Sequence, residues 1–289
     1  MTGKTNIAAS IRQRLLNLAR ERGEAFEQVL VAYALERVLY RLAESAHRDR
    51  FVLKGALLFR LWFDLAQRPT RDADFLGFGD AEPEQCAAVF REIVALDRSA
   101  EDGLLFDVAS VKADEIRKEA GYPGVRVSMR ATLDGARIPV QCDIGFGDAI
   151  TPEPQHQAYP TLLDLPAPIL AVYPLETVIA EKLEAMVKLA GFNSRMKDYF
   201  DLWVLMHYEN FDRALLPAAM RATFARRQTA LPTSLPAGMA PAFAAKQEKM
   251  WQAFLSRSGL TAPPLAKVLN ELREQCWPLL QAAAGPEAA

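Results

Sequence analysis

A proline-rich stretch limits what this chain can fold into. Residues 152–174 contain six prolines in 23 positions, and each proline fixes φ and lacks a backbone N–H donor. Such a stretch can hold neither a long helix nor a central strand. We therefore interpret it as the connection between two domains, at 1–151 and 175–289. The chain has 289 residues, of which 51% are hydrophobic, so it can build a core in each domain.

The first domain, residues 1–151, has the pattern of a mixed α/β unit. Apolar residues recur at helical spacing near the N-terminus, whereas 138–146 alternates apolar with polar or small residues, as strands do. We expect two helices within 6–46, with a break at Gly23, followed by a strand at 51–53 and a helix from Gly55 to Phe63. A turn at Arg68-Pro69 then leads to a strand at 73–78. A helix after Pro83 and two or three strands within 104–146 complete the domain.

The second domain has helical periodicity throughout. Helices are expected at 175–190, 196–207, 213–226, 241–256 and 265–280, before a small Ala-rich tail. We therefore predict an α+β fold, with a mixed sheet and flanking helices followed by an α-helical C-terminal domain.

Two carboxylates lie together at the start of the expected strand at 73–78. Asp72 and Asp74 are two residues apart, so both side chains leave the same face of the strand. Neighbouring carboxylates repel each other, and a common reason to place them so is a hard divalent cation, which takes oxygen ligands. Asp143, on the polar face of 138–146, would be a third ligand if the two strands pair. The sequence thus predicts a metal site of Asp72, Asp74 and Asp143 for Mg²⁺, or for Mn²⁺ in its place.

Gly55 lies where the first expected strand gives way to a helix. The N–H groups at a helix N-terminus bind phosphate, and a residue without a side chain permits close approach. Lys54 and Arg60 would add positive charge there. A glycine before a helix is also a common turn residue, but the order strand, Gly, helix, turn, D-x-D and later strand Asp favours a site for a nucleoside triphosphate.

This order of motifs resembles the nucleotidyltransferase fold shared by DNA polymerase β and many small nucleotidyltransferases. Three segments resemble the AbiEii/AbiGii toxin family more closely: Lys54-Gly55-Ala56-Leu57, Arg68-x-Thr70-x-Asp72-x-Asp74, and Arg195-Met196-Lys197-Asp198-Tyr199-Phe200-Asp201-Leu202. Position 56 departs from the family, which more often has Gly or Ser there. The resemblance implies a toxin of a toxin-antitoxin system, a nucleotidyltransferase of the EC 2.7.7 type that modifies the 3′ end of RNA, notably the tRNA acceptor stem, and so stops translation.

Lys182 lies on the apolar stripe of the expected helix at 175–190, where an unpaired ammonium would be costly. Its side chain either extends past its neighbours to solvent or meets a carboxylate or phosphate. By resemblance to the family, Lys182 and Asp198 act as catalytic residues that face the nucleotide site from the helical domain and complete its cleft. Asp201 has either a structural or a functional role.

Three further residues are candidates for nucleotide binding. Arg195 and Lys197 would bind the triphosphate or the acceptor's backbone, although solvated charges at a helix start look the same in sequence. Thr70 precedes Asp72 by two residues and is either a turn former or a modification site. Phosphorylation there would place about two negative charges beside the metal ligands and block the site.

The net charge of −2 conceals an uneven distribution. Residues 71–119 hold 13 acidic and 6 basic residues, a balance of −7, whereas 220–260 hold 6 basic and 1 acidic, a balance of +5, and 1–50 hold 9 basic and 6 acidic, a balance of +3. Basic flanks around an acidic centre suit a polynucleotide substrate. The +5 segment also suits an acidic antitoxin.

Several other classes of protein are disfavoured. Cys86, Cys142 and Cys276 are odd in number and far apart, which argues against a disulfide framework or a zinc site. No run of about 20 apolar residues and no secretory signal is present, so we expect a cytoplasmic protein without a membrane segment. Walker A, G-x-S-x-G and G-x-G-x-x-G motifs in the required context are missing as well.

The sequence therefore predicts a Mg²⁺-dependent nucleotidyltransferase toxin that uses NTP and RNA, with a cognate antitoxin. One alternative keeps the fold but transfers a nucleotidyl or phosphoryl group to a protein or small molecule. Another is a non-catalytic module that binds a nucleotide or an antitoxin.

Overall fold

The structure is a computed structural model that describes residues 6–63, 70–117, 123–207 and 211–285. The predicted Arg68-Pro69 turn and the end of the Ala-rich tail fall outside the described residues. The chain divides into two compact units: unit 1 comprises Met1–Gly147 and Gln155–Val172, and unit 2 comprises Asp148–Pro154 and Tyr173–Ala289. None of the described helices combines the length and the apolar character needed to cross a bilayer.

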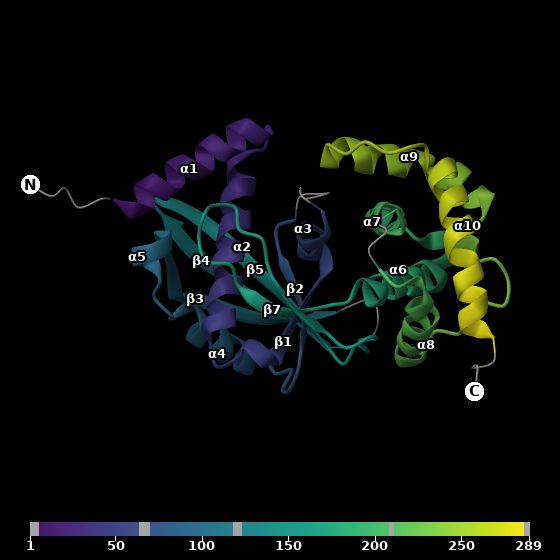
Figure 1. Ribbon diagram of the computed structural model, residues 1–289, viewed down its shortest axis with the longest axis horizontal. Helices are drawn as coiled ribbons and strands as arrows, with labels where there is room; N and C mark the ends of the chain where they lie inside the picture. The colour runs from purple at the N-terminus through teal and green to yellow at the C-terminus, as the bar shows by residue number, and fades with distance from the viewer. Residues whose placement is uncertain (1–5, 64–69, 118–122, 208–210, 286–289) are drawn as a thin grey trace, which may run out of the picture. The chain divides into compact units, whose positions relative to one another are not determined.

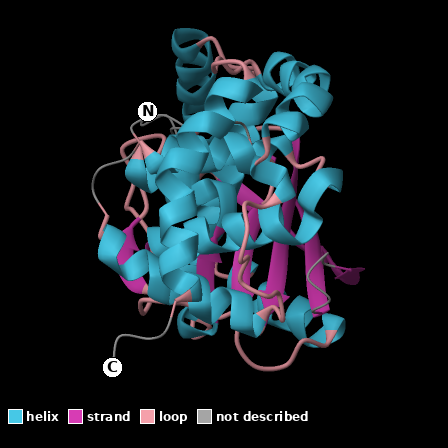
Figure 2. Cartoon of the chain, turned by 90° about the vertical axis from the view of Figure 1, so that its right-hand side faces the viewer, coloured by secondary structure: helices cyan, strands magenta, loops and turns pink. Residues whose placement is uncertain are grey.

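A seven-stranded mixed sheet organises the described part of unit 1, in the order β3-β4-β5-β2-β1-β7-β6 (Figures 1 and 2). β1 is antiparallel to β2 and parallel to β7, β2 is parallel to β5, and β3, β4 and β5 form an antiparallel meander. The strands are β1 Phe51–Lys54, β2 Ala73–Gly77, β3 Leu104–Arg117, β4 Pro123–Leu133, β5 Ala136–Phe146, β6 Gln155–Ala158 and β7 Ile169–Val172.

The helices of unit 1 are α1 Ile7–Arg22, α2 Phe26–Glu44, α3 Phe59–Trp62, α4 Pro83–Val94 and α5 Ser99–Asp102. Gly23 ends α1 in the left-handed conformation, with φ of 65°. The predicted helix from Gly55 begins as a 3₁₀ turn, Gly55–Leu58, and continues as α3. The predicted α+β class is confirmed by these elements.

The interpretation of 152–174 as a simple connection is wrong over most of its length. Residues 155–158 and 169–172 form β6 and β7, which belong to unit 1, and β7 lies between β1 and β6 in the sheet. The prolines at 154, 160, 166, 168 and 174 all lie outside the two strands, so neither ladder loses an N–H donor. The chain thus leaves unit 1 after Gly147, contributes Asp148–Pro154 to unit 2 and then returns to the sheet.

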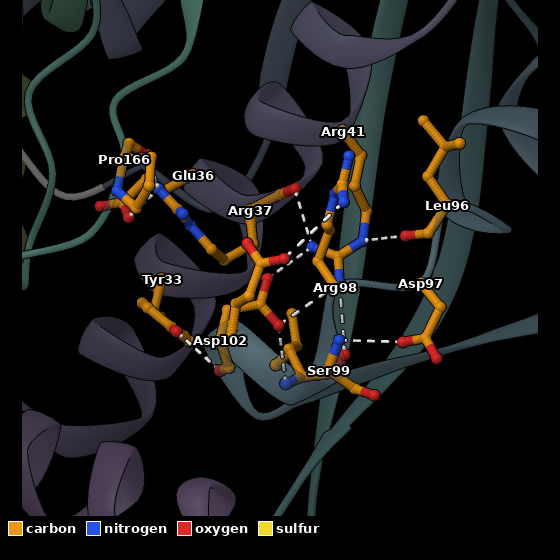
Figure 3. Close-up of polar contacts among 12 residues, drawn as sticks. Tyr33, Glu36, Arg37, Arg41, Leu96, Asp97, Arg98, Ser99, Asp102 and Pro166 are labelled. Atoms are coloured by element: carbon orange, nitrogen blue, oxygen red, sulfur yellow. Dashed lines mark hydrogen bonds and ion pairs between the residues drawn. The ribbon is translucent and has the colours of Figure 1, made fainter.

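A buried ionic network ties α2 to the rest of unit 1 (Figure 3). Arg41 donates to Asp102 Oδ2 at 2.7 Å and to the carbonyls of Leu96 and Leu104. Arg37 pairs with Glu36 at 2.7 Å, and Glu36 in turn accepts from the backbone N–H of Leu162. Breaking a buried pair of this kind costs about 3–5 kcal/mol, so the network fixes the position of α2 on the sheet.

Unit 2 is helical, as the sequence predicts. Its helices are α6 Leu175–Leu189, α7 Met196–Met206, α8 Leu216–Arg226, α9 Pro241–Ser258 and α10 Leu265–Ala284. Phe200, Trp251 and Phe254 pack against one another where α7 meets α9. α6 is buried on more than its apolar stripe, because Thr177 bonds to the backbone of Thr151, and Glu184 is 2% exposed.

Candidate active site

The D-x-D carboxylates lie where β2 enters the sheet between β1 and β5. Ala73 and Phe75 are fully buried on one face, whereas Asp72 and Asp74 are partly exposed on the other. β2 pairs with β5 in a register that sets Asp74 directly beside Asp143. The predicted approach of the Asp143 strand to the D-x-D strand therefore occurs.

A cross-strand row of charged residues passes through this point. Lys54 on β1 is opposite Asp74, Asp143 is opposite Arg126 on β4, and Arg126 is opposite Asp114 on β3. Directly paired residues present their side chains on the same face of a sheet. We refer to Lys54, Asp74, Asp143, Arg126 and Asp114 as the charge ladder; two cations flank its two central carboxylates.

Arg126 is a site residue that the motif analysis missed. Its Nε and Nη2 donate to Asp143 Oδ1 and Oδ2 at 2.9 and 2.8 Å. This hydrogen bonding raises the pKa of Arg126, and Asp72 and Asp74 add to the rise through their charges. The Asp134-Gly135 turn between β4 and β5 is the signal that could have found it, because a two-residue hairpin turn fixes the register of its strands.

Gly55 occupies a position that a side chain would block. Its φ is +77°, in the left-handed region, and an added Cβ would lie 2.8 Å from Asp74 Cβ and closer still to its carboxylate. Glycine alone adopts this conformation at no steric cost. The predicted proximity of the glycine turn to the D-x-D motif is therefore a direct contact in the structure.

The three predicted metal ligands are not arranged as a ready-made ion site. Asp143 is engaged by Arg126, and Asp72 Oδ1 accepts from Thr70 Oγ1 at 2.9 Å. Within the described ranges, no group of three His, Cys, Asp or Glu side chains is placed to hold a metal ion. The structure brings Asp74 and Asp143 together, and the three-carboxylate site stays a prediction.

The remaining predicted residues of unit 1 have other partners. The Thr70 hydroxyl bonds within its own turn, which accounts for a threonine at this position without modification. Arg60 bonds to the Tyr159 side chain and lies in the field of Glu36. Lys54 is 8% exposed in the ladder. Phosphate binding by Lys54, Gly55, Arg60 and Thr70, and phosphorylation of Thr70, stay predictions.

Unit 2 contains a second cluster of predicted residues. Lys182 Nζ donates to Asp201 Oδ2 at 2.8 Å and to Asp198 Oδ1 at 3.3 Å. Arg195 Nε lies 2.5 Å from Asp198 Oδ2, and Lys197 is exposed one residue before Asp198. Lys182 thus meets carboxylates, which was one of its two predicted environments. We refer to Lys182, Arg195, Asp198 and Asp201 as the unit 2 ion cluster.

Asp198 is held in its charged form although it is buried. Burial alone would raise the pKa of this carboxyl, but the charges of Lys182, Arg195 and Lys197 outweigh burial, so its pKa is lowered. Asp201 is fully buried and forms an ion pair with Lys182. Its contact supports the structural side of its two predicted roles.

One arginine of the basic segment at 220–260 does not contribute to an exposed positive surface. Arg227 is 11% exposed and pairs with Asp148, Glu181 and Glu184 at 3.0–3.2 Å. In the other basic flank, the side chains of Arg37 and Arg41 are buried in the network of α2. These three arginines serve structural roles, so the positive surface is smaller than the charge count predicts.

The cysteines and histidines show no catalytic arrangement. Cys86, Cys142 and Cys276 are buried and free. Burial raises the pKa of Cys142 and Cys276, so both thiols stay protonated at neutral pH. His207 bonds to the carbonyl of Trp203, as expected for a histidine that packs at a helix end.

Comparison with known proteins decides the family. The profile described as "Nucleotidyl transferase AbiEii toxin, Type IV TA system" matches residues 37–281. The chain belongs to this family. AbiEii membership covers both units, confirms the resemblance of the motifs, and implies a nucleotide substrate, a divalent metal and an antitoxin partner.

Other comparisons add little. No curated protein matches the chain. Two crystal structures from Helicobacter pylori are similar to it, each at 17% sequence identity. JHP933 matches with a TM-score of 0.47 and covers 86% of this chain and 90% of its own. A chain described as a candidate nucleotidyltransferase matches with a TM-score of 0.45 and covers 86% of this chain and 93% of its own. Neither bears on the activity of this AbiEii family member.

Replacing Gly55 with Ala should destabilise the protein more than replacing Gly23 with Ala. Both glycines have positive φ, at +77° and +65°, which costs an L-residue about 1–2 kcal/mol. At Gly23 a Cβ meets nothing within 4 Å, whereas at Gly55 it overlaps Asp74, and overpacking adds about 1–3 kcal/mol. Unfolding in guanidinium chloride, followed by circular dichroism, measures the difference. Equal losses would show that Asp74 does not constrain residue 55.

Replacing Lys182 with Met should lower the free energy of unfolding at pH 7 by about 3–5 kcal/mol, because it removes the cation that the buried Asp198 and Asp201 share. The pKa of Asp198 is lowered from 3.8. Ionised Asp198 therefore stabilises the wild type above pH 3.8, and this contribution is lost as the pH falls through the lowered pKa. The difference between wild type and variant should thus narrow below about pH 4, as measured by urea unfolding at several pH values.

Lys188→Met is the matched control, since Lys188 is an exposed lysine on the same helix. It should change stability by less than about 1 kcal/mol at every pH. A constant difference between wild type and Lys182→Met across the acid range would contradict the role of Lys182 in holding Asp198 ionised.

Proposed function

We propose that this protein transfers a nucleoside monophosphate from an NTP to the 3′-hydroxyl of an RNA with the help of a divalent cation. The observation that supports the proposal most is the register of β2 and β5, which sets Asp74 beside Asp143. The close approach of Gly55 to Asp74 adds to it, because only glycine lets the turn after β1 lie directly against this carboxylate. Membership of the AbiEii family supports nucleotidyl transfer as the class of reaction.

The donor chemistry of the site fits a hard cation. Asp72, Asp74 and Asp143 offer carboxylate oxygens, the ligand type of Mg²⁺ and Mn²⁺, and Asp143 is held by a cation, Arg126, in the structure described. When bound there, a divalent ion would lower the pKa of the attacking hydroxyl and hold the triphosphate. Arg126 would then exchange Asp143 for a phosphate oxygen, since a guanidinium binds either anion in the same bidentate way.

The reaction that we propose is a single displacement. The 3′-oxygen of the RNA attacks the α-phosphorus of the NTP. The bond between the α-phosphorus and the oxygen that bridges the α- and β-phosphates breaks, and pyrophosphate leaves with the electron pair of this bond. The hydroxyl proton is lost to solvent. We propose Lys54 and Gly55 as residues that bind the triphosphate. By resemblance to the family, we propose Lys182 and Asp198 as further catalytic residues, with Arg195 and Lys197 binding the triphosphate or the acceptor's backbone.

The acceptor and the biological outcome follow from the resemblance of the motifs. We propose the tRNA acceptor stem as the acceptor, a block of translation as the consequence, and the cytoplasm as the location. A cognate antitoxin would neutralise the protein. Phosphorylation of Thr70 would break its hydrogen bond to Asp72 and place negative charge beside the carboxylates.

Replacing Asp72 with Ala should abolish transfer and toxicity without unfolding the protein. Asp72 is partly exposed immediately before β2, so its loss leaves the core intact. Loss of an electrostatic group in an active site costs about 10²–10³-fold in rate or more. The assay incubates the protein with total RNA, Mg²⁺ and NTPs labelled at the α- or the γ-phosphate. Asp49→Ala, at a carboxylate whose side chain is 75% exposed, is the control and should retain full activity.

The two labels separate the proposal from its alternatives. Transfer of the α-label to RNA by the wild type and by Asp49→Ala, but not by Asp72→Ala, supports it. Transfer of the γ-label, or labelling of protein or small molecules in place of RNA, overturns the assigned acceptor or bond. Transfer that Asp72→Ala retains overturns the assigned site.

A further inference from the structure

Unit 1 contains a cavity that the proposed function has not used. Its volume is about 830 Å³, and it lies where the first turns of α2 meet β3, β4 and β5. Cavities that hold small ligands commonly measure about 300–1,000 Å³. The space is thus sufficient for part of a substrate rather than for a water molecule or an ion alone.

The charged side chains that line the cavity are mostly basic. Arg71, Lys112, Arg130 and Arg137 contribute to its wall, against one carboxylate, Glu27. All four cations are on exposed residues, and Arg130 pairs with Asp107 at 3.0 Å in an exposed contact that solvent weakens. The cavity therefore favours an anionic ligand.

One edge of β5 borders the cavity. β4 pairs with β5 from Ala136 onward, whereas the pairing with β2 begins only at Cys142. In the described part of the chain, residues 136–141 are thus paired on one side alone, and 137–141 line the cavity. Except at Pro139, which lacks a backbone N–H, such an unpaired edge offers N–H groups that bind phosphate oxygens as well as other strands.

An apolar wall complements the basic one. Leu30 and Val31 from α2, and Ile138 and Val140 from β5, line the same cavity. A ligand that combines phosphates with flat, partly apolar rings, as a nucleic acid strand does, would use both kinds of wall. An acidic peptide would use the cations and the strand edge but leave the apolar wall without a specific partner.

Two residues that line the cavity adjoin the predicted site. Gln141 lines it, and with its amide oriented to suit its neighbours, the Gln141 oxygen accepts from Arg126 Nε at 3.1 Å. Arg126 in turn holds Asp143. Arg71, another lining residue, directly precedes Asp72. A chain whose end lies at the carboxylates would therefore extend into this space.

We propose that this cavity binds the 3′-terminal nucleotides of the RNA acceptor, with phosphates on Arg71, Lys112 and Arg137 and bases against the apolar wall. This assignment rests on the proposed function, because it places the strand whose 3′-hydroxyl reacts at the carboxylates. It goes beyond that function in naming the surface of unit 1 that holds the acceptor.

The test is equilibrium binding of a single-stranded RNA oligonucleotide with a free 3′-hydroxyl and a 5′ fluorophore, followed by anisotropy in Mg²⁺ at several salt concentrations. Lys112→Glu and Arg137→Glu should each weaken binding about tenfold or more. Each should also reduce the slope of log K against log salt by about 0.7 for every phosphate that the variant no longer neutralises. Arg48→Glu, at an exposed arginine outside the cavity, should stay within about twofold of the wild type.

NTP binding, measured by calorimetry on the same proteins, separates the two proposals. Weaker RNA binding with unchanged NTP affinity in Lys112→Glu and Arg137→Glu supports the cavity as the acceptor site. If the wild type and both variants bind and label RNA equally, the cavity assignment is overturned and the proposed function stands; this is also the result expected if an acidic protein segment occupies the cavity. If the wild type binds NTP but no RNA, both proposals fail.

Discussion

The parallel pairing of β2 with β5 is the constraint on which the site of unit 1 depends. It sets Asp74 beside Asp143, and two carboxylates so placed repel each other in a partly buried position. The strands on either side offset this repulsion, because β1 contributes Lys54 and β4 contributes Arg126. Two cations thus balance the two central carboxylates of the ladder, and the lack of a side chain at Gly55 lets the turn after β1 contact Asp74 without overlap.

Unit 2 also balances buried charge with partners of opposite sign, but there the central residue is a cation and its neighbours are carboxylates. Lys182 is a cation on a helix that is buried on most sides, and it is compatible with burial because Asp198 and Asp201 accept its hydrogen bonds. Arg195 adds a second cation to Asp198. In each unit, some of the residues that resemble the family's motifs have charged partners on another element, as Asp74 has on β1 and Asp198 has on α6. Fold stability and the proposed chemistry therefore rely on the same side chains.

Local patterns predicted most helices, most strands and the central candidates, because periodicity, Gly23 and the D-x-D spacing act over a few residues. They did not predict β6 and β7, since a strand between prolines is defined by its partner in the sheet, far away in sequence. The burial of Arg227 could not be predicted from local patterns either, because it depends on acidic residues up to 79 positions away in the sequence. Arg126 is an intermediate case: its alternation with Val125 and Val127, together with the Asp134-Gly135 turn, was sufficient to place it opposite Asp143.

The central claim is that Asp72, Asp74 and Asp143 hold the divalent ion of a nucleotidyl transfer site. Anomalous diffraction from crystals grown with Mn²⁺ and a non-hydrolysable NTP tests it most directly. We predict an anomalous peak at about 2.0–2.3 Å from oxygens of Asp72 and Asp74, with the Asp143 carboxylate released from Arg126. A peak elsewhere in the protein, with the Arg126–Asp143 pair intact and nucleotide bound, would contradict it.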